Sequence, residues 1–173
     1  SVSLEQLKQY PLFDRKCYSL RESILDSQRN GIIAEFKRTS PSKGLINGTA
    51  TVEEVVQGYQ AAGASAISVL TDGDFFQGTL EDLTKARAVL TIPLLRKEFI
   101  VDKYQITEAK AYGADIILLI AACLSTQEVE EFSLYAKSLG LNVLLEVHND
   151  EELLNNIFTS IDAIGVNNRN LKD

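Results

Sequence analysis

Charged and polar side chains stand where several apolar segments of this sequence end. A strand end that meets solvent can hold such groups, but here both signs of charge recur at one strand end after another. Carboxylates and amines brought together in a poorly solvated site titrate as coupled groups, which is the equipment of general acid–base catalysis. The residues of this kind are Glu35, Lys37, Arg96, Lys97, Glu146, His148, Asn167, Asn168 and Arg169.

The spacing of these residues places many of them on shared faces. Side chains alternate between the two faces of a strand, so residues two apart point the same way. If those faces point into a common interior, two carboxylates and two ammonium groups meet at its mouth. Solvated ion pairs explain the charged residues at the end of any one strand equally well. They explain poorly why the ends of four strands all carry such residues. The sets that share a face are Ile33 with Glu35 and Lys37, Leu95 with Lys97, Leu144 with Glu146, and Asn167 with Arg169.

A loop-forming segment, TSPSKG at 39–44, follows the first of these apolar segments. Its hydroxyls, backbone amides and lysine can hold an anion, although the same residue types also make an ordinary turn. Phe75, Phe76 and Phe99 follow the next two segments, where they either fill the core or sandwich a planar ring. His148 is either a base or, more in keeping with its place, a polar rim residue.

Composition argues against several other kinds of function. The 173 residues are 45% hydrophobic and 24% charged, as in an ordinary globular domain, and the net charge of -7 makes nucleic acid or an anionic membrane a poor partner. One histidine and the scattered Cys17 and Cys123 predict no metal site, and no glycine-rich nucleotide motif occurs. Two lone cysteines and the lack of a long apolar run favour a cytoplasmic protein.

The elements that position these residues are predicted from apolar runs that alternate with amphipathic stretches. Runs rich in Ile, Leu and Val are typical of strands covered on both faces in a parallel sheet. The expected strands are Ile32–Phe36, Ala66–Leu70, Pro93–Arg96, Asp115–Ile120, Asn142–Val147 and Ala163–Asn167. Helices are expected after the capping residues Thr51, Thr79, Asp102, Ser125 and Asn149, with stops at Gly63, Gly113 and Gly140, and two more at Leu4–Lys8 and Leu20–Gln28.

The expected strands begin about 26 residues apart, the length of one strand plus one helix. This repeat is typical of an α/β fold, either a barrel or a doubly wound sheet. Eight such units close a (βα)8 barrel in ~250 residues, and six fit here. We therefore expect a single, incomplete barrel domain over 1–173, with a leading helical extension at 1–31 and units one to six at 32–173.

Five segments of the sequence resemble the indole-3-glycerol phosphate synthase family of tryptophan biosynthesis, whose members are TIM barrels. They follow the family's order and cover nearly the whole chain, and the first and last are specific to it. The resemblance implies a carbon–carbon lyase that needs no metal or cofactor. The segments are IIAEFKRTSPSKG (32–44), SVLTDGDFFQGTLEDL (68–83), PLLRKEFIVDKYQI (93–106), LLEVHNDEEL (144–153) and IGVNNRNL (164–171).

The implied reaction closes an indole ring: 1-(2-carboxyphenylamino)-1-deoxyribulose 5-phosphate becomes indole-3-glycerol phosphate, carbon dioxide and water. By its place in these motifs, Lys97 resembles the general acid that protonates the substrate's carbonyl oxygen, and Glu146 the general base of the later dehydration. Lys37 would hold the carboxylate that leaves as carbon dioxide. Glu35 would position these groups and tune their charge, and Asn167 would bond the substrate hydroxyls.

The resemblance also implies substrate contacts. Ser40 would contact the phosphate, Arg169 would stand beside the hydroxyl-binding asparagine, and Phe76, Phe99 and Leu118 would line an apolar slot for the anthranilate ring. The implied partner is a phosphorylated small molecule, with no nucleic acid and no membrane. The protein would be a monomer or associate with other enzymes of the tryptophan pathway.

Two alternatives stay open. The family's seventh and eighth strands, with a Ser-Glu-Ser-Gly-like segment and a glycine-rich phosphate loop, have no counterpart before Asp173, and the segment ahead of Pro11 is short. One alternative is therefore a catalytically silent fragment with exposed sheet edges. The other is a different phosphate-binding barrel such as phosphoribosylanthranilate isomerase, which needs a Cys–Asp pair at the edge where Lys97 and Glu146 stand here.

Overall fold

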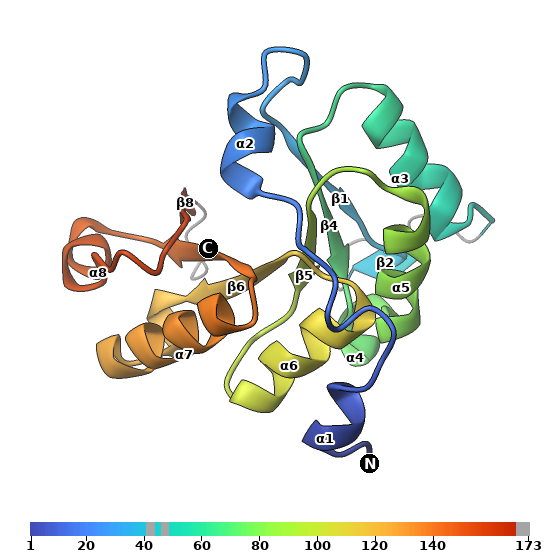
Figure 1. The fold of residues 1–173 in the computed structure, drawn as a ribbon. Helices are drawn as coiled ribbons and strands as arrows, with labels where there is room; N and C mark the ends of the chain where they lie inside the picture. The colour runs from blue at the N-terminus through green and yellow to red at the C-terminus, as the bar shows by residue number, and fades with distance from the viewer. Residues whose placement is uncertain (41–43, 46–48, 169–173) are drawn as a thin grey trace.

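Six parallel strands form one sheet in the computed structural model, which describes residues 1–40, 44–45 and 49–168. The order of the strands across the sheet is their order along the chain, so each pairs with the next (Figure 1). A doubly wound sheet reverses its order at a switch point, so this order confirms a half-barrel of βα units. The strands are β1 (Ile33–Phe36), β4 (Ala66–Leu70), β5 (Leu94–Lys97), β6 (Ile116–Ile120), β7 (Asn142–Val147) and β8 (Ala163–Val166).

Helices follow the strands and begin at the residues that the sequence predicts. The predicted capping side chains each accept a backbone N–H of the first turn, which satisfies donors that a helix start leaves unpaired. None of the helices in the described ranges is long and apolar enough to span a membrane. The helices are α3 (Val52–Ala61), α5 (Leu80–Val89), α6 (Lys103–Tyr112), α7 (Thr126–Ser138) and α8 (Asp150–Asn155).

Strand residues divide between two apolar clusters. Outward-facing side chains such as Ile67 and Ile117 pack with the helices in the larger cluster. Inward-facing side chains form a smaller cluster that includes Ala66, Leu95 and Leu118, all at most 3% exposed. Because residues two apart share a face, the inner rows run from an apolar layer straight into charged residues at the carboxyl ends of the strands.

The leading segment holds two helices that are shorter than the sequence predicts, α1 (Leu4–Leu7) and α2 (Leu20–Leu25). The second ends early because Asp26 adopts an extended conformation and its carboxylate accepts the N–H of Gln28 at 2.9 Å. Such a local side-chain bond competes with the helical ladder. The apolar spacing that predicts a longer helix does not register this turn.

Leu20 closes the amino-terminal end of the inner face. Its side chain is 1% exposed and belongs to the inner cluster. Its backbone N–H donates to Oδ1 of Asn142 at 3.2 Å, while Nδ2 of Asn142 donates to the carbonyls of Tyr18 and Asp115, both at 2.9 Å. One amide side chain thus joins the leading segment to the starts of β6 and β7.

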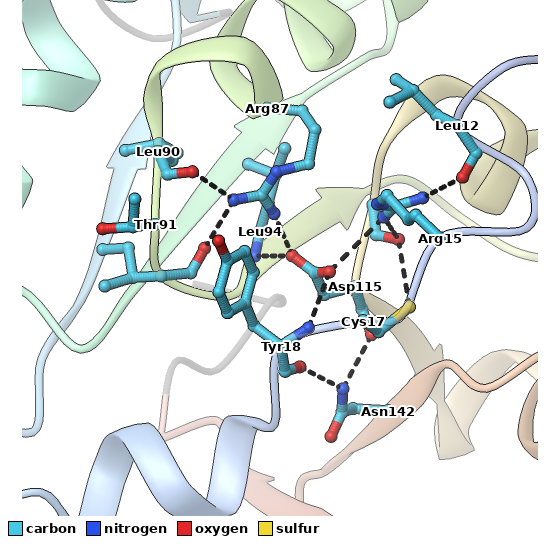
Figure 2. Close-up of polar contacts among 12 residues, drawn as sticks. Leu12, Arg15, Cys17, Tyr18, Arg87, Leu90, Thr91, Leu94, Asp115 and Asn142 are labelled. Carbon is cyan, nitrogen blue, oxygen red and sulfur yellow. Dashed lines mark hydrogen bonds and ion pairs between the residues drawn. The ribbon is translucent and has the colours of Figure 1, made fainter.

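Asp115, directly before β6, is a buried carboxylate held between two arginines (Figure 2). It pairs with Arg87 of α5 and lies 3.4 Å from Arg15 of the leading segment. It also accepts the backbone N–H groups of Leu94 at 2.9 Å and Tyr18 at 3.1 Å. Burial raises the pKa of Asp115 above its usual value, and the arginines offset only part of that rise. The network fixes the leading segment to the end of the sheet opposite the charged mouth.

The structure also contains short elements that the sequence pattern does not predict, because two to four residues carry no periodicity. The turn after one of them, the short helix at Gly73–Phe76, needs a glycine, since a Cβ on Gly78 would lie 2.0 Å from the carbonyl oxygen of Leu70. The preceding Gln77 takes the left-handed conformation, with φ of 53°. The unpredicted elements are α4 (Gly73–Phe76), the antiparallel pair β2 (Thr39–Ser40) and β3 (Gly44–Leu45), and a 3-10 turn, η1 (Ala121–Cys123).

Candidate active site

A cavity of about 230 Å³ opens at the carboxyl ends of strands β5 to β8. Leu95, Leu118 and Leu144 supply apolar lining from the inner face of three neighbouring strands. Lys97 and Glu146 lie two residues beyond Leu95 and Leu144, on the same faces, and line the same space. The remaining lining residues are Gly165, Val166, Asn167 and Asn168. A cation, a carboxylate and amide groups therefore converge over apolar side chains.

Lys97 is held by a carboxylate from a more distant strand. Its Nζ lies 3.3 Å from Oε2 of Glu35, at the end of β1. Oγ of Ser68, on the intervening strand β4, donates to the same oxygen at 3.2 Å. Both charged side chains are about one third exposed, so the pair is open to a ligand. The arrangement places an ammonium group with a fixed orientation beside the cavity.

Glu146 faces the cavity from β7 and lies near a second ionisable side chain. Nε2 of His148 is 3.9 Å from Oε2 of Glu146, and Nδ1 of the same ring is 3.3 Å from Oε1 of Glu152. The exposed fractions are only 21% for the Glu146 side chain, 20% for His148 and 16% for Glu152. A shielded carboxylate of this kind is suited to take up a proton from a bound molecule.

Of the other site residues that the sequence predicts, some line the cavity and some do not. Leu118 and Asn167 line the cavity. Lys37 is exposed, lies one residue beyond the end of β1 and does not line the cavity. Phe76, the last residue of α4, is half-buried, and Phe99 is 56% exposed; neither lines the cavity.

Two predicted contacts fall outside what the structure describes. Ser40 is expected to contact the phosphate. Its backbone lies in β2, but its side chain is outside the described part of the structure. Arg169 also lies outside the described residues.

Ser68 is a polar residue of this site that sequence reasoning misses. It is 3% exposed and sits within an apolar strand, AISVL, two residues after Ala66. A lone hydroxyl on the inner row of a buried strand was the available signal, because such a group needs a hydrogen-bond partner. The partner, Glu35, comes from the neighbouring strand, and the register that pairs Glu35 with Ser68 brings them together.

Within the described ranges, no group of three or more His, Cys, Asp or Glu side chains is arranged to hold a metal ion. Both cysteines are free thiols that do not line the cavity: Cys17 is half-buried at the amino-terminal end of the sheet, and Cys123 is exposed in η1. Of the described residues that line the cavity, only Lys97 and Glu146 are charged.

Curated proteins with related sequences are named indole-3-glycerol phosphate synthase. The protein from Bacteroides thetaiotaomicron is 49% identical over 171 residues, which cover 99% of this chain and 65% of the relative. Those from Desulfotalea psychrophila and Acinetobacter baumannii (strain SDF) are 48% and 52% identical, covering 88% and 87% of this chain. The chain spans 59% and 56% of the lengths of these two relatives.

Solved structures resemble the fold at low sequence identity. The carboxyl transferase domain Y628A of Rhizobium etli pyruvate carboxylase, with pyruvate, superposes with a TM-score of 0.54 at 13% identity, covering 78% of this chain and 27% of that chain. This likeness concerns the fold alone. The sequence model described as "Indole-3-glycerol phosphate synthase" matches residues 1–173. With that match over its whole length, and relatives near 50% identity, the chain belongs to the indole-3-glycerol phosphate synthase family.

Proposed function

We propose that this chain carries the acid–base centre of an indole-3-glycerol phosphate synthase. The reaction converts 1-(2-carboxyphenylamino)-1-deoxyribulose 5-phosphate to indole-3-glycerol phosphate, carbon dioxide and water. The observation that carries the proposal is the shared cavity of Lys97 and Glu146 in a chain of this family. Ring closure followed by dehydration needs a proton donor and a proton acceptor on opposite sides of one small substrate.

In the first step Lys97 acts as general acid. As the aromatic carbon forms its bond to the substrate's carbonyl carbon, the carbonyl oxygen gains a negative charge and takes a proton from Nζ. Glu35, 3.3 Å from Nζ, keeps the ammonium group oriented, and Ser68 steadies Glu35. Fixed donors of this kind stabilise charge as it develops, with little reorganisation during the reaction.

Loss of carbon dioxide then restores the aromatic ring. The bond between the ring and its carboxylate breaks, and its electron pair returns to the ring. Lys37, an exposed residue directly after β1, is the cation that we assign to this carboxylate. Leu95, Leu118 and Leu144 offer an apolar surface against which a planar ring can lie.

In the last step Glu146 acts as general base. It accepts a proton from the ring-closed intermediate, while the former carbonyl oxygen takes a second proton and departs as water; Lys97 gives this proton after solvent has returned the one that it lost in the first step. Asn167, which also lines the cavity, is assigned to the substrate hydroxyls. We assign phosphate contacts to Ser40 and support of the hydroxyl subsite to Arg169. The phosphorylated substrate is thus the expected small-molecule partner, and a cytoplasmic location stays a prediction.

The test is conversion of the substrate by the purified 173-residue chain, followed by the fluorescence of the indole product. We expect Lys97→Ala and Glu146→Gln each to lower turnover by about 10²–10⁴-fold, the usual contribution of one acid or base, with unchanged circular dichroism. Lys85→Ala, at an exposed lysine of α5, is the matched control. Turnover equal to the unaltered chain in both site variants refutes the assignment.

One observation favours a second candidate, a silent fragment. The chain spans 65% or less of the relatives compared above, and the described strands β1 and β8 each have only one neighbour in the sheet. A correctly folded chain that yields no product even with substrate in excess supports this candidate. The isomerase alternative is disfavoured, because neither cysteine lines the cavity where its acid–base pair would stand.

A further inference from the structure

His148 extends from the end of β7 on the same side as Glu146, because the two residues are two apart. Its backbone N–H donates to Oε1 of Glu152 at 3.1 Å, and its ring Nδ1 lies 3.3 Å from the same oxygen. Glu152 is itself fixed, since its N–H donates to the capping side chain of Asn149 at 2.8 Å. The contact with Glu152 therefore holds the ring of His148 against the first turn of α8.

The opposite edge of the ring faces Glu146. Nε2 lies 3.9 Å from Oε2 of Glu146, which is an ion-pair separation longer than the ~2.7–3.2 Å of an N–H···O hydrogen bond. Nε2 is buried and has no hydrogen-bond partner among the described residues. A buried polar atom without a partner is costly, and natural structures rarely retain one. This atom is aimed at the proposed general base.

The two contacts constrain where protons can sit. A carboxylate only accepts hydrogen bonds, so the contact of Nδ1 with Glu152 at 3.3 Å is a hydrogen bond only when Nδ1 carries a proton. A neutral ring then offers a bare lone pair at Nε2, and this would oppose the Glu146 carboxylate. The facing pair is stabilised only with a proton between Nε2 and Oε2. Glu152 thus determines which ring nitrogen of His148 carries the proton in the neutral ring. The protonation of Nε2 in turn determines whether the ring attracts or repels the Glu146 carboxylate.

We propose that His148 is a positioning residue that acts through Glu146, with Glu152 fixing its tautomer. The inference rests on the proposed function and deepens it. A second proton, on Nε2, is added to the one that Glu152 holds on Nδ1; in this doubly protonated form the ring draws one carboxylate oxygen of Glu146 toward it and leaves the other directed at the cavity. The imidazole touches neither substrate nor reacting atoms. Its effect is to hold a flexible carboxylate in one orientation, and hydrogen bonds in such sites commonly tighten when substrate binds.

The primary test is nitrogen-15 NMR of the ring, which needs no substrate. His148 is the only histidine among the 173 residues, so its two ring nitrogens give unambiguous signals. At a pH where the ring is neutral, we expect a protonated Nδ1 and an unprotonated Nε2. Glu152→Ala is expected to remove this preference, whereas Glu151→Ala, one residue earlier on an exposed position of α8, leaves it intact. A proton on Nε2 in the unaltered neutral ring overturns the proposal.

A second variant addresses the other contact and covers the case in which Glu152→Ala fails to fold. We expect Glu146→Gln to move the Nε2 signal, because the amide replaces the facing carboxylate. The control Glu151→Gln is expected to leave that signal in place. An Nε2 signal that ignores Glu146→Gln contradicts the proposed contact.

A kinetic readout separates positioning from simple structural support. In turnover assays, His148→Leu is expected to lower kcat by up to about 10²-fold, the cost of misplacing a reacting group by an ångström, with KM little changed. His148→Gln, whose amide can still donate to Glu146, is expected to recover part of kcat. Equal losses in both variants, or a loss carried by KM alone, overturn the positioning role. If the ring signals of the unaltered chain are as expected but the chain has no turnover, the proposed function is refuted, whereas the contacts of His148 with Glu146 and Glu152 are not.

Discussion

Nζ of Lys97 lies 3.3 Å from Oε2 of Glu35, although the two residues belong to strands β5 and β1, which do not touch in the sheet. Ser68 on the strand between them donates to the same oxygen at 3.2 Å. The three side chains form a row across the inner face at the level where apolar lining gives way to charge. Lys97 therefore owes its orientation to two residues that lie far from it in sequence.

We predict that Glu35→Gln impairs turnover more than it impairs folding. The pair is about one third exposed, and ion pairs of this kind contribute ~1 kcal/mol or less to stability. Loss of the charge that orients the general acid is expected to lower kcat by about 10²-fold. Urea unfolding and the fluorescence assay measure the two effects. Ser68→Ala, which keeps the ion pair and removes one hydrogen bond, is expected to lower kcat less. A large stability loss with unchanged kcat in Glu35→Gln contradicts this view.

Asp115→Asn is predicted to destabilise the fold by about 3–5 kcal/mol, because it leaves two arginines without their buried partner. Asp115 pairs with Arg87 and Arg15 and is fully shielded from solvent. The control is Glu131→Gln, which breaks the exposed pair with Lys103 and is expected to cost ~1 kcal/mol or less. Chemical denaturation gives both values. Equal losses in the two variants show that the Asp115 network contributes little.

The two cysteines are predicted to differ in reactivity toward an alkylating reagent. The pKa of the Cys17 thiol is raised, chiefly by burial and then by the nearby Asp115 carboxylate, so little reactive thiolate forms near neutral pH. Cys123 is exposed. Mass spectrometry of the native protein is expected to show one rapid addition, at Cys123, and a second only on unfolding. Rapid double addition to the folded chain contradicts the described environment of Cys17.

Tyr112 is predicted to ionise late in an alkaline titration. A hydrogen bond with Tyr10, followed by burial, raises its pKa to about 12, and the two rings meet edge to face at 5.5 Å. Because the pKa is raised in the folded state, the stabilising contribution is complete below the unfolded value of about 10 and is lost as pH rises through about 12. Ultraviolet difference absorbance measures tyrosinate directly. Tyr10→Phe is expected to move the late transition to lower pH, and Tyr59→Phe, at a more exposed ring, to leave it in place.

Local sequence signals determined most of the secondary structure. The predicted strands match those observed to within a residue or two at each end, and α6 lies between its predicted cap Asp102 and its predicted stop Gly113. These signals succeed because a cap and a glycine stop act on amide groups only a few residues away. The alternation of side chains along a strand likewise placed Lys97 and Glu146 on predictable faces.

Tertiary structure alone decided which of these faces meet and what each charged group touches. The Glu35–Lys97 pair depends on strand order and register, which bring together two residues 62 positions apart. Helix α2 ended early at a local turn, and α4 was too short for any periodic signal. The physical reason is one of range: capping and alternation act between near neighbours, whereas the site is assembled from residues separated by tens of positions, whose meeting only the packed sheet specifies.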